Sequence, residues 1–460
     1  MISAVDGRQS TASPVVPAPS AAALAHIPGS SGWPIIGNTL EALADPKGMA
    51  VRYARKYGPV YRTYTLGAHT VTLLGPEANE FLLLDQAKCF SSAHGWGKVF
   101  ERLFPRGLML LDFEEHRLHR KALSVAFKAG PMKSYMSALD EGFSRAVRKW
   151  LKKPPALRFY PEIKETTLEL AAVSFLGSSV GAEMQAIKQA YVDMISAAVA
   201  PVRSPLPGTQ MRRGVKARQF MIDYFKAQVP LRRAGEGDDL FSQLCKATTD
   251  DGVLLSAQEI ADHMNFLMMA AHDTLASSLT SFVYFLAKDR EWRERLREEM
   301  RALGLAKEEP LPYERLQEAP LTEMAFNEAI RLIPPAPSIL RCAIRDVAFA
   351  GFQIPAGVCV NINPLYTHHM PEHWPEPEKF DPFRFTTEAA RSRHKYAFTP
   401  FGGGAHMCLG LHFAYMQAKC FAYRLLTAAD FALESNYRPE WKYWPIPQPR
   451  DGLHVSLSPI

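Results

Sequence analysis

A glycine-rich loop near the C-terminus contains a lone cysteine and runs directly into an amphipathic helical segment. The loop reads FGGGAHMCLG, from Phe401 to Gly410, and LHFAYMQAKCFAYRLL follows it. Glycines let a backbone approach a flat cofactor closely, and the first turn of a helix favours a negatively charged sulfur. The pattern therefore predicts that Cys408 supplies a thiolate to a metal. A buried free cysteine beside a helix cap is the structural alternative.

The loop resembles the haem-binding signature of the cytochrome P450 family, F-x-x-G-x-[R/H]-x-C-x-G. The matching residues are Phe401, Gly404, His406, Cys408 and Gly410. The resemblance implies haem b (iron protoporphyrin IX) with Cys408 as the iron ligand, and a thiolate ligand favours O–O cleavage. It also implies that residues of the loop contact the cofactor, namely Phe401, Gly402, His406 and Gly410.

Composition is compatible with a large globular enzyme. The chain has 460 residues, of which 47% are hydrophobic and 22% are charged, so it can bury a substantial core. The net charge of +6 is small for this length and comes with no basic run, which argues against nucleic-acid binding. The six cysteines form no CxxC pair, so neither a zinc site nor a disulfide scaffold is indicated, and a reducing compartment fits best.

The N-terminus is rich in proline, alanine and serine and has no apolar stretch of about 20 residues that could span a bilayer. We interpret residues 1–26 as a flexible leader and residues 27–460 as a single catalytic domain. The sequence predicts a soluble, cytoplasmic protein. The basic stretch 201–218 is predicted to be a mobile surface connection that could touch a membrane peripherally.

The expected fold class is mainly α with a smaller β-rich region, the cytochrome P450 fold. Residues 60–75 alternate β-formers and predict a hairpin, and a second group of short strands is expected after residue 340. The longest helix should run from about Ser256 to Asp289. It begins with a capping-box pattern, since Glu259 follows Ser256 by three residues.

The long helix carries the polar residues of the segment AAHDT, Ala270 to Thr274, within an apolar run. A buried acid and hydroxyl cost free energy unless they are paired, so this segment is a candidate functional site. It is similar to the oxygen-activation motif of cytochrome P450 enzymes, A-G-x-[D/E]-T, with Ala271 replacing the usual glycine. The resemblance implies that Thr274 and Asp273 are catalytic and handle protons, and that Ala270 contacts the cofactor. A purely structural pair, satisfied by helix carbonyls or a neighbouring lysine, is the alternative.

A third segment, FNEAIRLIPPAPSILR, places Glu328 and Arg331 on one face of a helix. The later segment PEKFDPFRF contains Arg384, and this order matches the E-x-x-R helix and P-x-R-F segment of the family. The resemblance implies a buried, structural charge network of Glu328, Arg331 and Arg384.

Haem carries two propionates, which need cationic or hydrogen-bonding partners. Four residues at the family's positions are candidates: His116, Arg120, Arg341 and His406. An apolar pocket beside the cofactor would select a lipophilic substrate such as a terpenoid, steroid, retinoid or fatty acid. Its expected walls are Trp96, Phe104, Leu108, Phe266, Met269, Pro337 and Ile339.

The implied reaction is hydroxylation or epoxidation with O2, in a protein that we expect to be monomeric. Electrons would come from a separate ferredoxin or flavodoxin. A basic docking patch for such an acidic partner is expected at Arg117, His119, Lys121 and Lys419. Two alternatives stay open: a haem-thiolate enzyme that uses peroxide or rearranges a hydroperoxide, and a non-enzymatic haem sensor.

Overall fold

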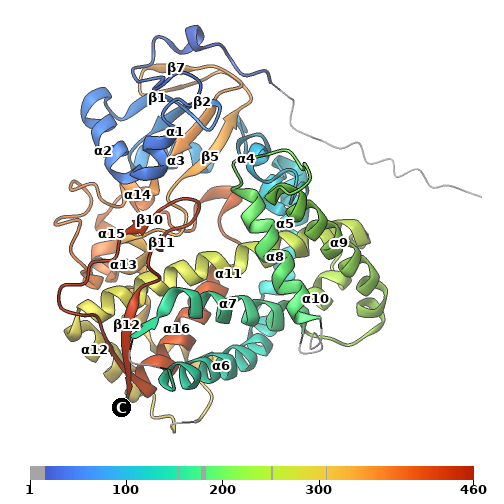
Figure 1. Cartoon of the computed structure of the whole chain (residues 1–460), viewed down its shortest axis with the longest axis vertical. Helices are drawn as coiled ribbons and strands as arrows, with labels where there is room; N and C mark the ends of the chain where they lie inside the picture. Colours follow the sequence, from blue (N-terminus) through green and yellow to red (C-terminus); the bar gives the residue numbers. More distant parts are fainter. Residues whose placement is uncertain (1–15, 154–155, 178–182, 250–251, 307) are drawn as a thin grey trace, which may run out of the picture.

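Helices form most of the structure, and the main sheet lies at one end of it, near the top of Figure 1. A computed structural model describes residues 16–153, 156–177, 183–249, 252–306 and 308–460. The predicted fold class, mainly α with a smaller β-rich region, is confirmed. The α-helices are α1 (Thr39–Ala44), α2 (Pro46–Tyr57), α3 (Pro76–Leu84), α4 (Ser92–Phe100), α5 (Phe113–Ser124), α6 (Ala129–Leu151), α7 (Phe159–Leu176), α8 (Met184–Ala198), α9 (Gln210–Ala234), α10 (Leu240–Lys246), α11 (Ala257–Lys288), α12 (Arg290–Ala302), α13 (Pro320–Leu332), α14 (Pro364–Thr367), α15 (Thr387–Ser392) and α16 (Leu411–Ala428).

The strands are short and fall into small sheets. They are β1 (Val60–Thr65), β2 (Ala68–Leu73), β3 (Phe90–Ser91), β4 (Ala156–Arg158), β5 (Ile339–Ala343), β6 (Val347–Phe349), β7 (Phe352–Ile354), β8 (Cys359–Ile362), β9 (Ala429–Ala432), β10 (Trp441–Lys442), β11 (Gln448–Pro449) and β12 (His454–Pro459). In the described residues the largest sheet has the order β1-β2-β8-β5-β3. The predicted hairpin is β1 and β2. Of the strands predicted after residue 340, β5 and β8 join it, since β8 pairs with β2 in parallel, whereas β6 and β7 form a separate two-stranded sheet.

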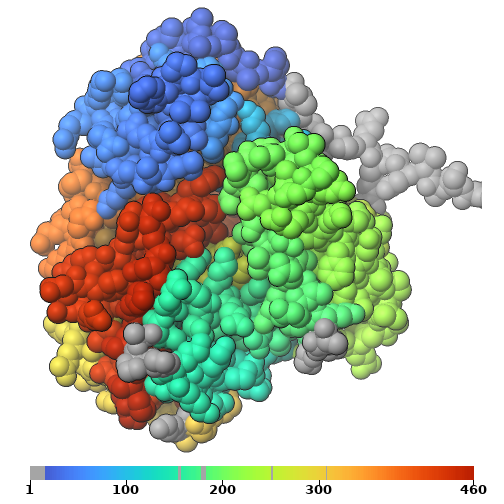
Figure 2. Space-filling view, viewed as in Figure 1, coloured from blue at the N-terminus to red at the C-terminus, as the bar shows by residue number. Residues whose placement is uncertain are grey.

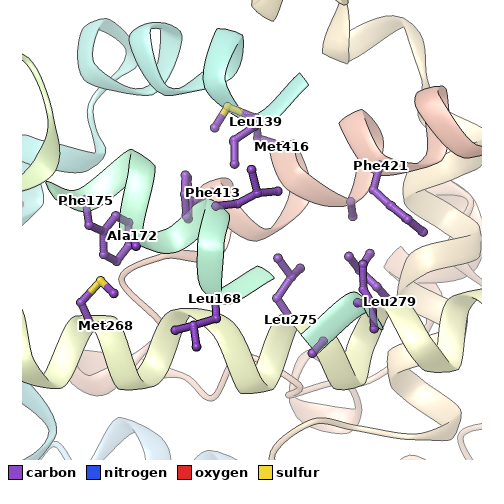
Figure 3. Packing of buried hydrophobic residues seen from close by; sticks show 14 of the residues in the cluster. Leu139, Leu168, Ala172, Phe175, Met268, Leu275, Leu279, Phe413, Met416 and Phe421 are labelled. Carbon is purple, nitrogen blue, oxygen red and sulfur yellow. The ribbon is translucent and has the colours of Figure 1, made fainter. Parts of the chain in front are cut away.

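Helix α11 runs through the middle of the molecule (Figure 1), and its bounds agree with the predicted helix from about Ser256 to Asp289. Both halves of the capping box are present: Ser256 Oγ accepts from the Glu259 N–H, and Glu259 Oε2 accepts from the Ser256 N–H. Side chains from α6, α7 and α16 form one hydrophobic cluster with side chains of α11 (Figure 3). Each fully buried Leu or Phe contributes about 1.5–3 kcal/mol to this packing. The labelled residues are Leu139 of α6, Leu168, Ala172 and Phe175 of α7, Met268, Leu275 and Leu279 of α11, and Phe413, Met416 and Phe421 of α16.

This packing positions the candidate site. It fixes α16, which follows the cysteine loop, relative to α11, which carries Thr274. Although α11 has 32 residues, no helix among the described residues is both long and apolar enough to cross a bilayer.

The described part of the predicted leader packs against the sheet region. Residues Ala21–Leu24 form a 3-10 helix, and the side chain of Leu24 is fully buried with Ile27 in the core of the main sheet. The ring of His26 hydrogen-bonds through Nε2 to the Gln353 carbonyl of β7. Residues 1–15 lie outside the described residues.

The expectation of a surface connection over 201–218 is wrong for residues 210–218, which belong to α9, whereas residues 201–209 form no helix or strand and are mostly exposed. Helix α9 begins at Gln210 with Thr209 as its N-cap, and Met211 is fully buried. Before the helix, the Arg203 guanidinium donates to the carbonyls of Ala197 and Ala198 on α8, and also to the Lys98 and Val99 carbonyls of α4. This arginine therefore fastens the α8–α9 connection to α4, and the green surface of that connection lies beside the blue N-terminal region in Figure 2.

Candidate active site

The cysteine loop is a tight turn held against α3. The Cys408 N–H donates to the Phe401 carbonyl at 2.9 Å, which closes the loop. Gly404 has φ +60°, and a Cβ there would lie 1.9 Å from the Leu83 carbonyl oxygen. Only glycine fits this approach, so the glycine-rich sequence is explained by the contact between the loop and α3.

The Cys408 thiol has the surroundings of a metal ligand. Its side chain is accessible to solvent, and the protein atoms around the sulfur raise the pKa of the thiol by desolvation. The Gly410 N–H, at the start of α16, and the Arg120 guanidinium both lower that pKa. A backbone donor and a cation that favour the thiolate are what a sulfur ligand to a metal needs.

Four basic side chains gather beside this cysteine, from three separate parts of the chain. The rings of His116 on α5 and His406 in the loop are stacked with centroids 3.9 Å apart. Burial, with Arg120 adding to the effect, lowers the pKa of His116 to about 4, and burial also lowers the pKa of His406 well below its usual value. Burial lowers the pKa of Arg341 on β5 to about 10.

This cluster is suited to an anionic ligand. Within the described residues Arg120 forms no side-chain hydrogen bond or ion pair, and the Arg341 side chain donates only to its neighbour's carbonyl, Leu340 O, at 2.8 Å. Two guanidiniums and two neutral imidazoles can therefore all donate to carboxylates. A thiol beside donors for two carboxylates is the donor set that haem b requires.

The polar residues of α11 have partners of the kinds named in the structural alternative, a helix carbonyl and a lysine. Thr274 Oγ1 donates to the Ala270 carbonyl at 2.9 Å, the bond that the sequence suggested. The Asp273 carboxylate, 6% exposed, forms an ion pair with Lys164 Nζ of α7 at 2.7 Å, and His272 Nε2 lies 3.4 Å from the same oxygen, Oδ1. Lys164 is about one-third exposed, so these groups connect the centre of α11 with the protein surface.

One stretch of α11 differs in exposure from the rest of the helix. Most of its residues are buried, but Met269, Ala270, Ala271 and Thr274 are only half-buried. Ala270 and Thr274 are four residues apart, so they share one face of the helix. This face is therefore partly accessible in the middle of an otherwise buried helix, as a face beside a cofactor should be.

The predicted pocket walls include a row of aromatic rings that leads to α11. The ring of Trp96 lies 5.7 Å from Phe100, Phe100 lies 6.1 Å from Phe104, and Phe104 lies 6.5 Å from Phe266, all between centroids. Three further predicted wall residues are Leu108 and Ile339, which are buried, and Pro337, which is half-buried.

The structure brings the three residues of the predicted charge network together. Glu328 and Arg331, both 0% exposed, form two hydrogen bonds of 2.6 and 2.8 Å, and Arg384 Nε lies 3.3 Å from Glu328 Oε1. Arg331 also donates to the His368 and Lys379 carbonyls. Both oxygens of Glu328 are thus hydrogen-bonded within the set, whereas Arg384 Nε is held by the ion pair without a hydrogen bond of its own.

The comparison with known families now decides the class of protein. The model of the family described as Cytochrome P450 matches residues 27–444. The chain belongs to the cytochrome P450 family.

Relatives cover nearly the whole chain. Cytochrome P450 136 of Mycobacterium tuberculosis is 36% identical over 448 residues, which are 96% of this chain and 90% of that protein. Cytochrome P450 120 of Synechocystis sp. is 32% identical over 439 residues, 94% of this chain and 97% of that protein. A solved structure described as retinoic acid-bound cyanobacterial CYP120A1 has a TM-score of 0.83 and 30% identity, covering 97% of this chain and 100% of its own.

Cytochrome P450 proteins bind haem through a cysteine thiolate and act as monooxygenases. The predictions of family, enzyme class and haem cofactor are therefore confirmed. The basic cluster beside Cys408 agrees with this cofactor, because it offers the propionates of the haem several donors from α5, β5 and the loop.

The basic docking patch expected for this cytochrome P450 is not formed by the four predicted residues. His119 is buried, and its Nδ1 lies 2.7 Å from His263 Nε2 of α11. Lys419 is 7% exposed and pairs with Glu323 at 2.6 Å. Only Arg117 and Lys121 are exposed, and Arg117 pairs with Glu114. A charge count cannot detect this, because long cationic side chains can lie along a helix interface and meet an acid there.

Sequence reasoning missed several residues that support the site. Lys164 lies 109 positions before Asp273, and no local pattern connects the two. His368 accepts from the Thr399 N–H through Nε2, and Arg393 stacks on Trp374 at 3.9 Å beside the charge network. For His368, Trp374 and Arg393, the sequence signal is their aromatic or basic character near the P-x-R-F segment. Lys164 has no such signal.

Proposed function

We propose that this cytochrome P450 hydroxylates or epoxidises a lipophilic small molecule, with Cys408 as the axial ligand of its haem. The observation that carries the proposal is the Cys408 thiol, which faces the Gly410 N–H and Arg120 beside a cluster of carboxylate-binding donors. His116, Arg120, Arg341 and His406 would hold the propionates. When bound, the haem supplies the chemistry of oxygen activation and electron transfer.

The protein's own residues would manage protons and water on the other side of the cofactor. Lys164 Nζ, which reaches solvent, would exchange a proton with Asp273 Oδ1, 2.7 Å away. Asp273 would pass it inward, and the Thr274 hydroxyl, whose proton is directed to the Ala270 carbonyl, would accept a hydrogen bond from the incoming donor. This acid and hydroxyl pair supports a reaction with O2 over one driven by peroxide.

The pocket supports an extended, apolar substrate, and we favour an isoprenoid acid of the retinoid kind. The aromatic row from Trp96 to Phe266 offers flat apolar surfaces without a buried charge among its rings. Such surfaces hold a polyene chain by area and shape. The similar cyanobacterial protein, described as retinoic acid-bound, supports the same class.

We further propose that residues 27–460 form one catalytic domain, that the protein is a cytoplasmic monomer, and that a separate ferredoxin or flavodoxin supplies electrons. The family match begins at residue 27, which supports the first boundary. The net charge of +6 supports an acidic partner.

Optical titration of the purified haem protein tests the substrate class. We expect retinoic acid to give a low-spin to high-spin shift at micromolar concentration, and we expect an oxygenated product when a surrogate ferredoxin system is added. Fatty acids of equal length serve as the comparison. A shift with fatty acids and none with retinoic acid would reject the isoprenoid assignment and leave the monooxygenase assignment standing.

The proton-handling role predicts the behaviour of Thr274→Val. This variant should bind haem and substrate normally, while product per NAD(P)H consumed falls about 10-fold or more, because a positioned proton-transfer group contributes about 10²–10⁴-fold. Product and NAD(P)H are measured together. Thr280→Val is a matched control, since Thr280 Oγ1 makes the same bond to the carbonyl four residues earlier, Ala276 O, in the core. Equal coupling in both variants would contradict the role.

A further inference from the structure

Two cysteines lie opposite each other on adjacent strands of the main sheet. Cys342 lies on β5 and Cys359 lies at the start of β8, and the antiparallel register places the two residues directly opposite. All six cysteines belong to the described residues and are free thiols in the structure. In an antiparallel sheet, directly opposite side chains lie on the same face, so these two thiols are neighbours.

Backbone hydrogen bonds show which kind of pair this is. The Ala343 N–H donates to the Val358 carbonyl at 2.9 Å, and the Gly357 N–H donates to the Ala343 carbonyl at 2.7 Å. Gly357, with φ +83°, is the extra residue of a bulge that ends the pairing here. Ala343 therefore directs its backbone groups towards β8, and the preceding residue, Cys342, must direct its own away from β8.

The pairing of β5 with β3, on its other edge, agrees with this orientation of Cys342. Cys342 pairs there with Ser91 of β3, and the Ile344 N–H donates to the Cys89 carbonyl at 2.8 Å, so even-numbered residues of β5 point towards β3. Cys342 and Cys359 are thus a non-hydrogen-bonded pair, whose Cα atoms lie about 4.5 Å apart. A disulfide requires Cα atoms about 4.4–6.8 Å apart, so the backbone already satisfies the spacing.

The surroundings allow a small oxidant to react but keep the thiols protonated at rest. Cys342 is 7% exposed, whereas Cys359 is half-buried. Burial raises the pKa of Cys342 to about 12, with neighbouring Cys359 adding to the effect, and burial also raises the pKa of Cys359. The exposed ammonium of Lys98 on α4 lowers both pKa values. Oxidation should therefore be slow at neutral pH and faster in alkaline solution, where the thiolate fraction is larger.

We propose that Cys342 and Cys359 form a reversible disulfide when the protein meets hydrogen peroxide. The thiolate of one cysteine attacks a peroxide oxygen and breaks the O–O bond, which gives a sulfenic acid and, after protonation, one water. The second thiol then attacks the sulfenic sulfur, forms the S–S bond and releases the second water. The two thiols lose two electrons and two protons, and peroxide is reduced to two waters.

The proposed disulfide would lie on the strand that also carries residues of the candidate active site. Cys342 directly follows Arg341 of the basic cluster, and β5 also carries Ile339 of the predicted pocket wall. A cross-link would fix the spacing of β5 and β8 at this point. The proposal does not rest on the identity of the substrate, because peroxide alone is the second reactant.

Thiol mapping of the wild-type haem protein tests the proposal without any variant. The protein is treated with a few equivalents of hydrogen peroxide at mildly alkaline pH, quenched with catalase, alkylated while denatured and digested for mass spectrometry. We expect a loss of two alkylatable thiols, one linked pair of peptides containing Cys342 and Cys359, and full recovery after dithiothreitol. Intact monomer mass should fall by two hydrogens.

Two variants test whether the link is specific to this pair of cysteines. Cys89→Ser removes another thiol beside the same sheet and should leave the linked peptides unchanged. Cys359→Ser should abolish the link and leave Cys342 as a sulfenic acid that dimedone traps. A link between any other two cysteines, a disulfide-bonded dimer, oxidation of Cys342 to sulfinic acid without a link, or two thiols that stay free would each overturn the proposal.

Discussion

A Cys408→Ser variant should lose the carbon monoxide spectrum of a haem-thiolate protein and nearly all monooxygenase activity. The reason is the ligand: a thiolate donates electron density to the iron, whereas a serine hydroxyl stays protonated beside Arg120 and donates little. We expect turnover to fall by about 10³-fold or more, which corresponds to a rise of about 4 kcal/mol in the barrier. Reduced protein with carbon monoxide should lack the strong red displacement of the absorption maximum.

The other cysteines make the assignment testable by comparison. Cys245 and Cys420 are fully buried in the helical core, and burial raises the pKa of both thiols, most of all for Cys420. At Cys408, by contrast, the Gly410 N–H and the Arg120 guanidinium lower the pKa of the thiol. Cys89→Ser should therefore keep the wild-type spectrum. A red-displaced maximum that survives in Cys408→Ser would reject the whole reading of the site.

Local sequence patterns predicted those elements that depend on interactions between residues close together in the sequence. The capping box of α11 needs only Ser256 and Glu259, three residues apart, and the β1–β2 hairpin needs only alternating β-formers around a turn. The loop with Cys408 is local in the same sense, because its glycines and the following helix are contiguous. The pairing of Glu328 with Arg331 follows from helical spacing.

Contacts between distant segments could not be read in this way. The Lys164–Asp273 ion pair joins α7 to α11, and the His116–His406 stack joins α5 to the cysteine loop. Each depends on how helices pack, which the composition of either segment does not reveal. The error over 210–218 has the same origin, because the helix that begins at Gln210 buries Met211 against other helices, and the basic stretch alone does not show this packing.

Removing the charge of Glu328 should destabilise the protein by about 3–5 kcal/mol, the cost of breaking a buried ion pair. In Glu328→Gln, the Arg331 guanidinium would remain 0% exposed with only the neutral amide and the His368 and Lys379 carbonyls as acceptors. The variant also keeps only one acceptor oxygen, whereas the two oxygens of Glu328 accept from Arg331 Nε, from Arg331 Nη2 and from the Asp381 N–H at 2.9 Å. Urea unfolding followed by the haem absorption, together with haem content after purification, measures the effect.

An exposed pair of the same spacing provides the control. Arg315 and Glu318, in the 3-10 helix Tyr313–Glu318, form two hydrogen bonds of 2.9 and 2.6 Å in water, so Glu318→Gln should leave the urea midpoint unchanged. Removing both buried charges in Glu328→Gln/Arg331→Met should cost less than the sum of the single changes, because the double variant no longer leaves the Arg331 guanidinium unpaired, while Arg384 loses its acid in the single and the double variant alike. Equal changes in the free energy of unfolding for Glu328→Gln and Glu318→Gln would show that burial adds nothing to the Glu328 pair. A change in the double variant equal to the sum of the two single changes would show that Glu328 and Arg331 contribute independently.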